Sequence, residues 1–153
     1  MTVRFLLVRH AKAEKHAASD EVRRLTPEGR ERFLALLRAL QGEGSLAVER
    51  IATSPYVRTR QTADLLAGVT GASVEEEAAL ASGASTGGEV LALARRLAGA
   101  GRGVALCGHN PEIAEAIGLA AGGSPEVKPG SVALVEDGPS GARLLWLRSP
   151  PKS

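Results

Sequence analysis

The feature that most constrains the fold of this chain is a short apolar run, residues 3–8, that stops abruptly at Arg9 and His10. Arg4 is the only polar residue in the run, which is typical of a strand buried on both faces. In open α/β sheets, ligands bind in the crevice at the carboxyl ends of such strands, because the following helices direct their N-termini into it. Arg9 and His10 are therefore predicted to lie in a ligand-binding crevice.

Two later segments repeat this arrangement of a strand followed by polar residues. Residues 49–53 lead into a Ser-Pro turn and then Arg58, and residues 104–107 lead into Gly-His-Asn-Pro, which contains His109. Taken singly, a histidine after a strand is usually a polar loop residue, and an arginine in a first helical turn is usually a solvated surface charge. Together, two histidines and two arginines at one edge of a sheet indicate a bound anion, which we predict to be phosphate.

The segments between these strands carry helix signals. Capping residues, early prolines and terminal glycines predict four helices. The first starts at Thr26 and Pro27 and is ended by Gly42 and Gly44, and the second runs from Ser54 and Pro55 to Gly68. The third runs from the Thr86–Glu89 capping box to Gly99 and Gly101, and the fourth starts at Asn110 and Pro111. We expect a loop across the top of the sheet at residues 13–24, a short strand at 72–75, and a hairpin of two edge strands at 131–136 and 142–147. The alternation predicts an α/β fold: a single-domain three-layer sandwich over residues 1–153, with a mostly parallel central sheet, helices on both faces and a C-terminal edge hairpin.

Composition narrows the functional classes. The chain has 153 residues, long enough for one domain with a hydrophobic core, and 44% of them are hydrophobic. A net charge of only +2 and an aromatic content of 3% argue against nucleic acid as a partner. No apolar run approaches the roughly 20 residues that span a bilayer, and the start of the chain does not resemble a signal peptide. With Cys107 as the lone cysteine, we expect a cytoplasmic protein without membrane partners, and no oligomeric state is predicted.

Two histidines and two arginines around an anion suit phosphoryl transfer. Arginine binds phosphate oxygens through a planar fork and stays charged at any working pH. A neutral imidazole can attack phosphorus without a separate base, so a histidine would be the nucleophile and a phosphohistidine the intermediate. No metal or cofactor is predicted, because the arginines and the second histidine can stabilise the transferring group.

Other phosphate chemistries fit the sequence less well. The P-loop pattern G-x-x-x-x-G-K-[ST] is absent. A cysteine phosphatase would carry an arginine six residues after its nucleophile, but Ile113 occupies that position after Cys107, so Cys107 is predicted to be a core residue. A zinc site made from His10, His16 and His109 would lack the H-E-x-x-H pattern and any cysteine cluster.

Three motifs resemble, in order and spacing, those of the histidine phosphatase superfamily, which includes the phosphoglycerate mutases. They are Val8-Arg9-His10-Ala11, the Ser-Pro-Tyr-Val-Arg-Thr-Arg-Gln-Thr-Ala segment at 54–63, and Gly108-His109. The short chain, the segment at 19–29 and the Arg-His-Ala-Lys form of the first motif resemble the phosphohistidine phosphatases of the SixA type. The resemblance covers nearly the whole chain.

This resemblance implies roles for particular residues. His10 would be the phosphorylated nucleophile; Arg9, Arg58 and His109 would form the phosphate pocket, and Arg23 would add a contact. The commonest first motif of the superfamily has Gly where this chain has Ala11, which is a small change.

The sequence offers no convincing match to the acidic residue with which many members protonate the leaving group. The run Glu75 to Glu77 is expected to be a solvated face, although Asp20 or Glu77 could supply an acid once the loops are folded. Little chain remains for a lid, so we expect a shallow, open site that admits a protein surface. The predicted function is a metal-independent phosphatase for protein phosphohistidine. A small-molecule phosphomonoesterase and a non-catalytic phosphate- or phosphoprotein-binding module remain alternatives.

Overall fold

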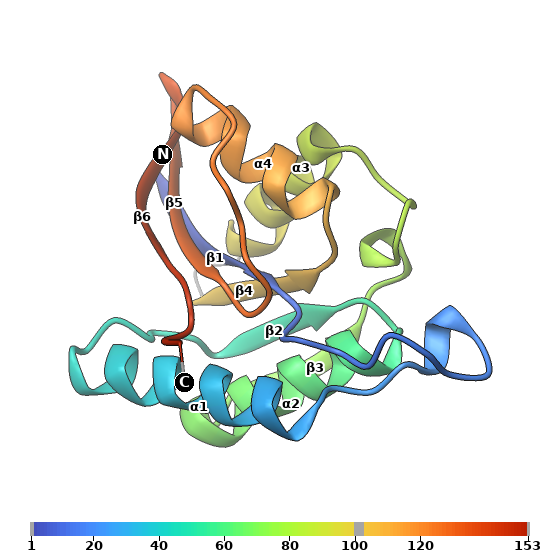
Figure 1. The fold of residues 1–153 in the computed structure, drawn as a ribbon. Helices are drawn as coiled ribbons and strands as arrows, with labels where there is room; N and C mark the ends of the chain where they lie inside the picture. Colours follow the sequence, from blue (N-terminus) through green and yellow to red (C-terminus); the bar gives the residue numbers. More distant parts are fainter. Residues whose placement is uncertain (1, 100–102, 153) are drawn as a thin grey trace.

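The computed structural model describes residues 2–99 and 103–152 (Figure 1). Its centre is a six-stranded sheet in the order β3-β2-β4-β1-β5-β6. The strands are β1 (Val3–Arg9), β2 (Arg50–Thr53), β3 (Ser73–Glu76), β4 (Val104–Gly108), β5 (Val132–Gly138) and β6 (Gly141–Arg148). Strands β1 to β4 are parallel to one another, whereas β5 runs antiparallel to β1 and forms a hairpin with β6. The mostly parallel sheet and the C-terminal hairpin are confirmed. Of the two hairpin strands only β6 lies at an edge, because β5 pairs with β1 on its other side.

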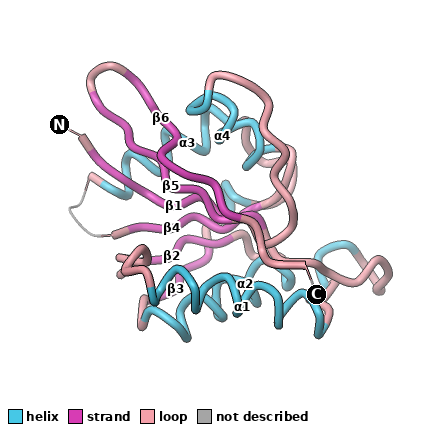
Figure 2. The backbone as a smooth tube through the Cα atoms, turned by 60° about the vertical axis from the view of Figure 1, so that its left-hand side comes forward, coloured by secondary structure: helices cyan, strands magenta, loops and turns pink. Residues whose placement is uncertain are grey.

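Helices cover both faces of this sheet (Figure 1 and Figure 2). They are α1 (Pro27–Gly42), α2 (Val57–Thr70), α3 (Gly87–Ala98) and α4 (Glu112–Ala121), with two short 3₁₀ helices, η1 (Asp20–Val22) and η2 (Ala78–Leu80). Successive side chains of β1 point to opposite faces, so Leu6 and Val8 pack beneath α1 and α2 while Phe5 and Leu7 pack beneath α3 and α4. This alternation produces two hydrophobic cores and the expected three layers.

Local signals place the start of α1 against the segment that follows β1. The Thr26 hydroxyl accepts a hydrogen bond of 2.9 Å from the backbone N–H of Gly29, and Pro27 occupies the first helical position, as predicted. A Cβ at Gly29 would overlap the backbone carbonyl of Lys12, so glycine permits this close approach. The predicted capping box of α3 is also present, because Thr86 and Glu89 cap each other's backbone N–H groups.

The predicted bounds of α2 were wrong at both ends. The helix begins at Val57 with Tyr56 as its N-cap, because the Ser54 hydroxyl accepts a bond from the Tyr56 N–H and holds the Ser-Pro pair in a turn. It continues through Gly68 and ends at Thr70, where Gly71, with a φ of 78°, provides the left-handed C-cap. One glycine inside a helix costs only about 1 kcal/mol, which the packing of α2 outweighs.

Smaller corrections concern the other elements. Helix α4 starts at Glu112, with Pro111 as its N-cap residue, while the Asn110 side chain accepts from the backbone of Ala114. Strand β3 lies one residue later than predicted. Gly99 follows α3 as expected, and Gly101 lies outside the described residues. Within residues 2–99 and 103–152, no helix is long and apolar enough to cross a bilayer.

Candidate active site

The sheet brings the ends of β1, β2 and β4 to one edge. Because β4 lies between β2 and β1, the residues that follow these strands are neighbours. Two hydrogen bonds extend the ladder past the strand ends: the His10 N–H donates to Gly108 at 3.0 Å, and the Ser54 N–H donates to Cys107 at 3.1 Å. His10, the turn at Ser54 and His109 therefore lie close together, as predicted.

His10 has a defined tautomer and orientation. Its Nδ1 lies 2.7 Å from the Ala11 carbonyl oxygen, which can only accept, so Nδ1 carries the proton and Nε2 carries the free electron pair. Nε2 in turn accepts from Nε of Arg58 at 3.3 Å. Burial, followed by the charges of Arg58, Arg9 and Arg23, lowers the pKa of His10 to about 4, although the Ala11 carbonyl opposes the shift. The imidazole is therefore neutral and nucleophilic at neutral pH.

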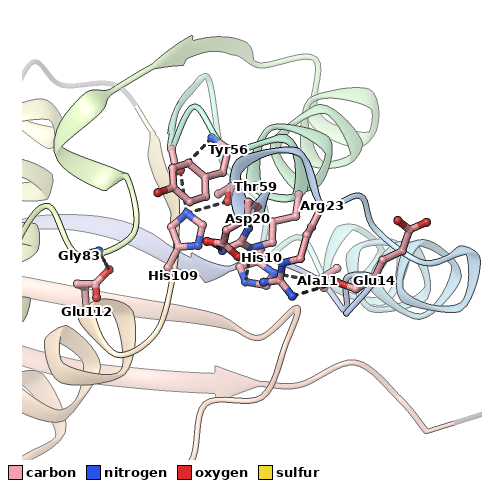
Figure 3. Close-up of polar contacts among 12 residues, drawn as sticks. His10, Ala11, Glu14, Asp20, Arg23, Tyr56, Thr59, Gly83, His109 and Glu112 are labelled. Atoms are coloured by element: carbon pink, nitrogen blue, oxygen red, sulfur yellow. Dashed lines mark hydrogen bonds and ion pairs between the residues drawn. The ribbon is translucent and has the colours of Figure 1, made fainter. Parts of the chain in front are cut away.

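His109 lies beside His10, with 5.3 Å between the ring centroids (Figure 3). Its Nε2 is 2.8 Å from the Ser54 hydroxyl and 3.2 Å from the Thr59 hydroxyl. When one of these hydroxyls donates to Nε2, the proton of the ring is on Nδ1, which is buried and lacks a hydrogen-bond partner among the described residues. Burial and the charges of His10 and Arg58 lower the pKa of His109 to about 3. A neutral N–H donor at Nδ1 is suited to an oxyanion.

Arg58 comes from the first turn of α2 and is only 3% exposed. Besides the bond to His10, its guanidinium donates to the backbone carbonyl of Asp20 at 2.7 Å and to the Asp20 carboxylate at 3.3 Å. Thr62, one turn later, accepts from the Ala11 N–H and donates to the Arg58 carbonyl, so it ties α2 to the loop after His10. These contacts fix the guanidinium beside Nε2 of His10.

Arg9 is held differently from Arg58. Its Nη1 donates to the Val127 carbonyl at 2.9 Å, and Asn110 donates to the same oxygen at 3.1 Å. Its Nε is buried without a hydrogen-bond partner among the described residues, and burial lowers its pKa. Arg9 makes no direct contact with His10 among the described contacts, but its positive charge acts on the imidazole.

Arg23 and Asp20 lie beside His10 (Figure 3). Arg23 donates to the Asp20 carboxylate at 3.0 Å and to the Glu14 carbonyl at 3.0 Å. Asp20 thus bridges Arg23 and Arg58. Burial on its own would raise the pKa of Asp20, but the charges and hydrogen bonds of Arg58 and Arg23 together lower it, so the carboxylate is ionised at neutral pH.

The acidic residues other than Asp20 that we considered as proton donors make other contacts. Glu75 pairs with Arg50, Glu76 pairs with Arg60, and Glu77 accepts from the backbone N–H of Ala79. Glu75 and Glu76 are exposed, as expected for a solvated face, and they form ion pairs at the surface.

The buried acid near His109 also points elsewhere. Glu112 accepts from the backbone N–H of Gly83 at 3.3 Å and is directed away from the two imidazoles (Figure 3). It anchors the loop before α3 to the start of α4.

The pocket is less open at its base than expected. His10 is 9% exposed and His109 is 2% exposed, whereas the Asp20 side chain at the rim is 54% exposed. The reason is that the segment predicted as a loop across the sheet, residues 13–24, folds back on itself through an Ala13–Leu25 bridge and places Asp20 of η1 against Arg58. Cys107 is a core residue, as predicted, and burial raises its pKa to about 12.

Sequence reasoning gave Ser54 only a helix-capping role and gave Thr59 and Thr62 none; Ser54 and Thr59 contact the His109 ring, and Thr62 holds the loop that follows His10. Thr62 lies four residues after Arg58 and three after Thr59, a helical spacing that would have placed it on the inner face of α2. For metal binding, the described residues contain no group of three or more His, Cys, Asp or Glu side chains that could hold an ion.

Known proteins share this fold. The family model of the histidine phosphatase superfamily (branch 1) matches residues 5–84. The protein histidine phosphatase SixA complexed with tungstate superposes with a TM-score of 0.85 at 25% identity, over 96% of this chain and 97% of that one. A putative phosphohistidine phosphatase SixA from Agrobacterium tumefaciens gives 0.82 at 20% identity, over 97% and 98%. A mycobacterial glucosyl-3-phosphoglycerate phosphatase gives 0.67 at 17% identity, over 100% of both chains. No curated protein sequence matched the chain. With the family model covering more than half of its length, the chain belongs to the histidine phosphatase superfamily.

Proposed function

We propose that this protein is a metal-independent phosphatase that transfers a phosphoryl group to His10 and then to water, with protein phosphohistidine as its substrate. One observation carries the proposal: the Nε2 electron pair of a neutral His10 faces Arg58, beside the unpartnered Nδ1 of His109. A phosphoryl group placed against Nε2 would find a nucleophile and at least two donors already positioned.

The chemistry proceeds in two steps. In the first, Nε2 of His10 bonds to phosphorus while the bond between phosphorus and the leaving group breaks, and the electron pair of that bond returns to the leaving atom. Arg58, His109 and Arg9 stabilise the oxygens of the transferring group, on which negative charge is concentrated. In the second, a water oxygen bonds to phosphorus, the bond from phosphorus to Nε2 breaks, and inorganic phosphate and neutral His10 are regenerated as a proton passes to solvent.

The preference for a phosphohistidine rests on the leaving group. An alkoxide departs poorly without a positioned acid, whereas imidazole, with an ordinary pKa of about 6.5, can depart protonated. The carboxylate nearest the pocket, Asp20, is ionised and paired with two arginines, so it is a poor proton donor at neutral pH. The similar SixA structures, a protein histidine phosphatase and a putative phosphohistidine phosphatase, support the same substrate class.

We also propose that the substrate is a protein and that the enzyme acts in the cytoplasm. The side chain of Asp20, which contacts Arg58, is 54% exposed, so a protein surface could approach this side of the site. The lone thiol, Cys107, is buried in β4 and has no second cysteine for an internal disulfide, which agrees with a reducing compartment.

Second-order rate constants for a phosphohistidine protein and a panel of alkyl phosphates test the substrate class. We expect a clear preference for the phosphohistidine protein, and His10→Ala should be inactive toward all of them. A preference for any alkyl ester would instead favour a small-molecule phosphomonoesterase. Phosphate binding without turnover of any substrate would favour a non-catalytic binding module.

A further inference from the structure

The Asp20 carboxylate binds two of the arginines of the site, Arg58 and Arg23. Its Oδ2 accepts from Nη2 of Arg58 at 3.3 Å, and its Oδ1 accepts from Nε of Arg23 at 3.0 Å. An anion is therefore already bound to this part of the pocket, and it is a side chain of the protein (Figure 3). A phosphate that used the same donors of Arg58 and Arg23 would have to displace it.

Asp20 contacts Arg58 through its backbone, which is fixed, and through its side chain, which can rotate away. The backbone carbonyl of Asp20 accepts from Nη1 of Arg58 at 2.7 Å, and this contact does not depend on the side chain. The carboxylate is 54% exposed and belongs to a three-residue 3₁₀ helix whose N-cap, Ser19, makes no side-chain capping bond. Rotation of the Asp20 side chain into water would free one donor on each arginine while the backbone contact still holds Arg58.

The product of the proposed reaction makes such a competitor useful. Inorganic phosphate is a dianion or monoanion near neutral pH, and Arg9, Arg23 and Arg58 together with His109 would hold it strongly. Slow departure of the product limits turnover in many enzymes. When no phosphate is bound, the Asp20 carboxylate occupies Arg58 and Arg23 in a fraction of the molecules, and these molecules cannot use both arginines for the product. The apparent affinity for phosphate is lower by the fraction of molecules in which the arginines are free.

We propose that Asp20 promotes release of inorganic phosphate by competing with it for Arg58 and Arg23. Asp20 thereby acts through the arginines rather than on the reacting atoms. The inference rests on the proposed function, since it takes inorganic phosphate as the product that leaves this pocket.

Equilibrium titration with inorganic phosphate tests this role without requiring turnover. In Asp20→Asn the dissociation constant should fall about tenfold, as expected if the closed arrangement is roughly 90% populated in the wild type. Asp20→Ala should show the same direction of change, because both variants lack the competing charge. Product inhibition by phosphate should strengthen in parallel. Glu21→Gln is the matched control, since Glu21 follows Asp20 in η1 and contacts none of the pocket arginines among the described contacts.

The outcomes separate the inference from the proposed function. If phosphate binds the wild type and binding is unchanged or weaker in both Asp20 variants, Asp20 positions the arginines or is neutral, and the inference is overturned. If neither the wild type nor the Asp20 variants bind phosphate, the pocket is not a phosphate site and the proposed function fails with it. Tighter binding in both Asp20 variants, with Glu21→Gln unchanged, supports the inference.

Discussion

Replacing Arg58 by alanine should lower kcat/KM by one to two orders of magnitude or more. The side chain is 3% exposed, and its Nε lies 3.3 Å from the nucleophilic Nε2 of His10. Loss of one charge-assisted hydrogen bond to the transferring phosphoryl group costs about 1.5 to 3 kcal/mol. Because each 1.36 kcal/mol changes a rate about tenfold, one lost bond corresponds to roughly 10- to 100-fold, and loss of a bidentate contact to more.

The assay is hydrolysis of an artificial aryl phosphate, with folding of each variant checked by circular dichroism and thermal unfolding. Arg58→Lys should recover only part of the activity, because an ammonium group cannot reproduce the planar fork. Arg60→Ala is the matched control: Arg60 lies on the same helix, its side chain is 40% exposed, and it pairs with Asp64 and Glu76. Full activity in a folded Arg58→Ala protein would refute the proposed position of the phosphate.

The remaining predictions concern pH and the packing of α1. Because the pKa of His10 is about 4, its imidazole loses reactivity only as pH falls through that value, so kcat/KM corrected for substrate protonation should show no His10-dependent fall between pH 8 and 5. An acid limb near pH 6.5 in that profile would contradict the burial of His10. Gly29→Ala should destabilise the fold by about 1 to 3 kcal/mol in urea unfolding, since its Cβ would overlap the Lys12 carbonyl. Gly68→Ala, inside α2 with open space around it, should instead stabilise by about 0.4 to 1 kcal/mol, and equal effects at the two glycines would argue against the close approach.

Local chemistry made much of the fold predictable. The Thr26-Pro27 pair and the Thr86 capping box contain in sequence all the groups that form the cap, so the starts of α1 and α3 were predicted correctly. The Ser54-Pro55 pair looks like the Thr26-Pro27 pair but does not start α2. Its hydroxyl lies 2.8 Å from Nε2 of His109, a partner 55 residues away that no local pattern reveals.

The residues of the candidate site also differ in whether local sequence or a distant partner sets their position. His10 and His109 follow apolar strands, and the topology of a parallel sheet was enough to bring them together. Asp20 lies in an irregular segment, where its position is set by Arg58, a residue 38 positions later, and by Arg23. Its bridging role could not be predicted because an aspartate in a polar loop has many equivalent arrangements until the arginines are placed.

Trapping the phosphoenzyme tests the central claim most directly. The protein is mixed with a ³²P-labelled phosphoramidate or aryl phosphate, quenched within the turnover time without acid, and digested to locate the label. We predict one phosphoryl group per chain on His10, lost on brief acid treatment and stable in alkali, and no label in His10→Ala. Acid-stable label, or label that persists in His10→Ala, would contradict the claim that His10 is the nucleophile.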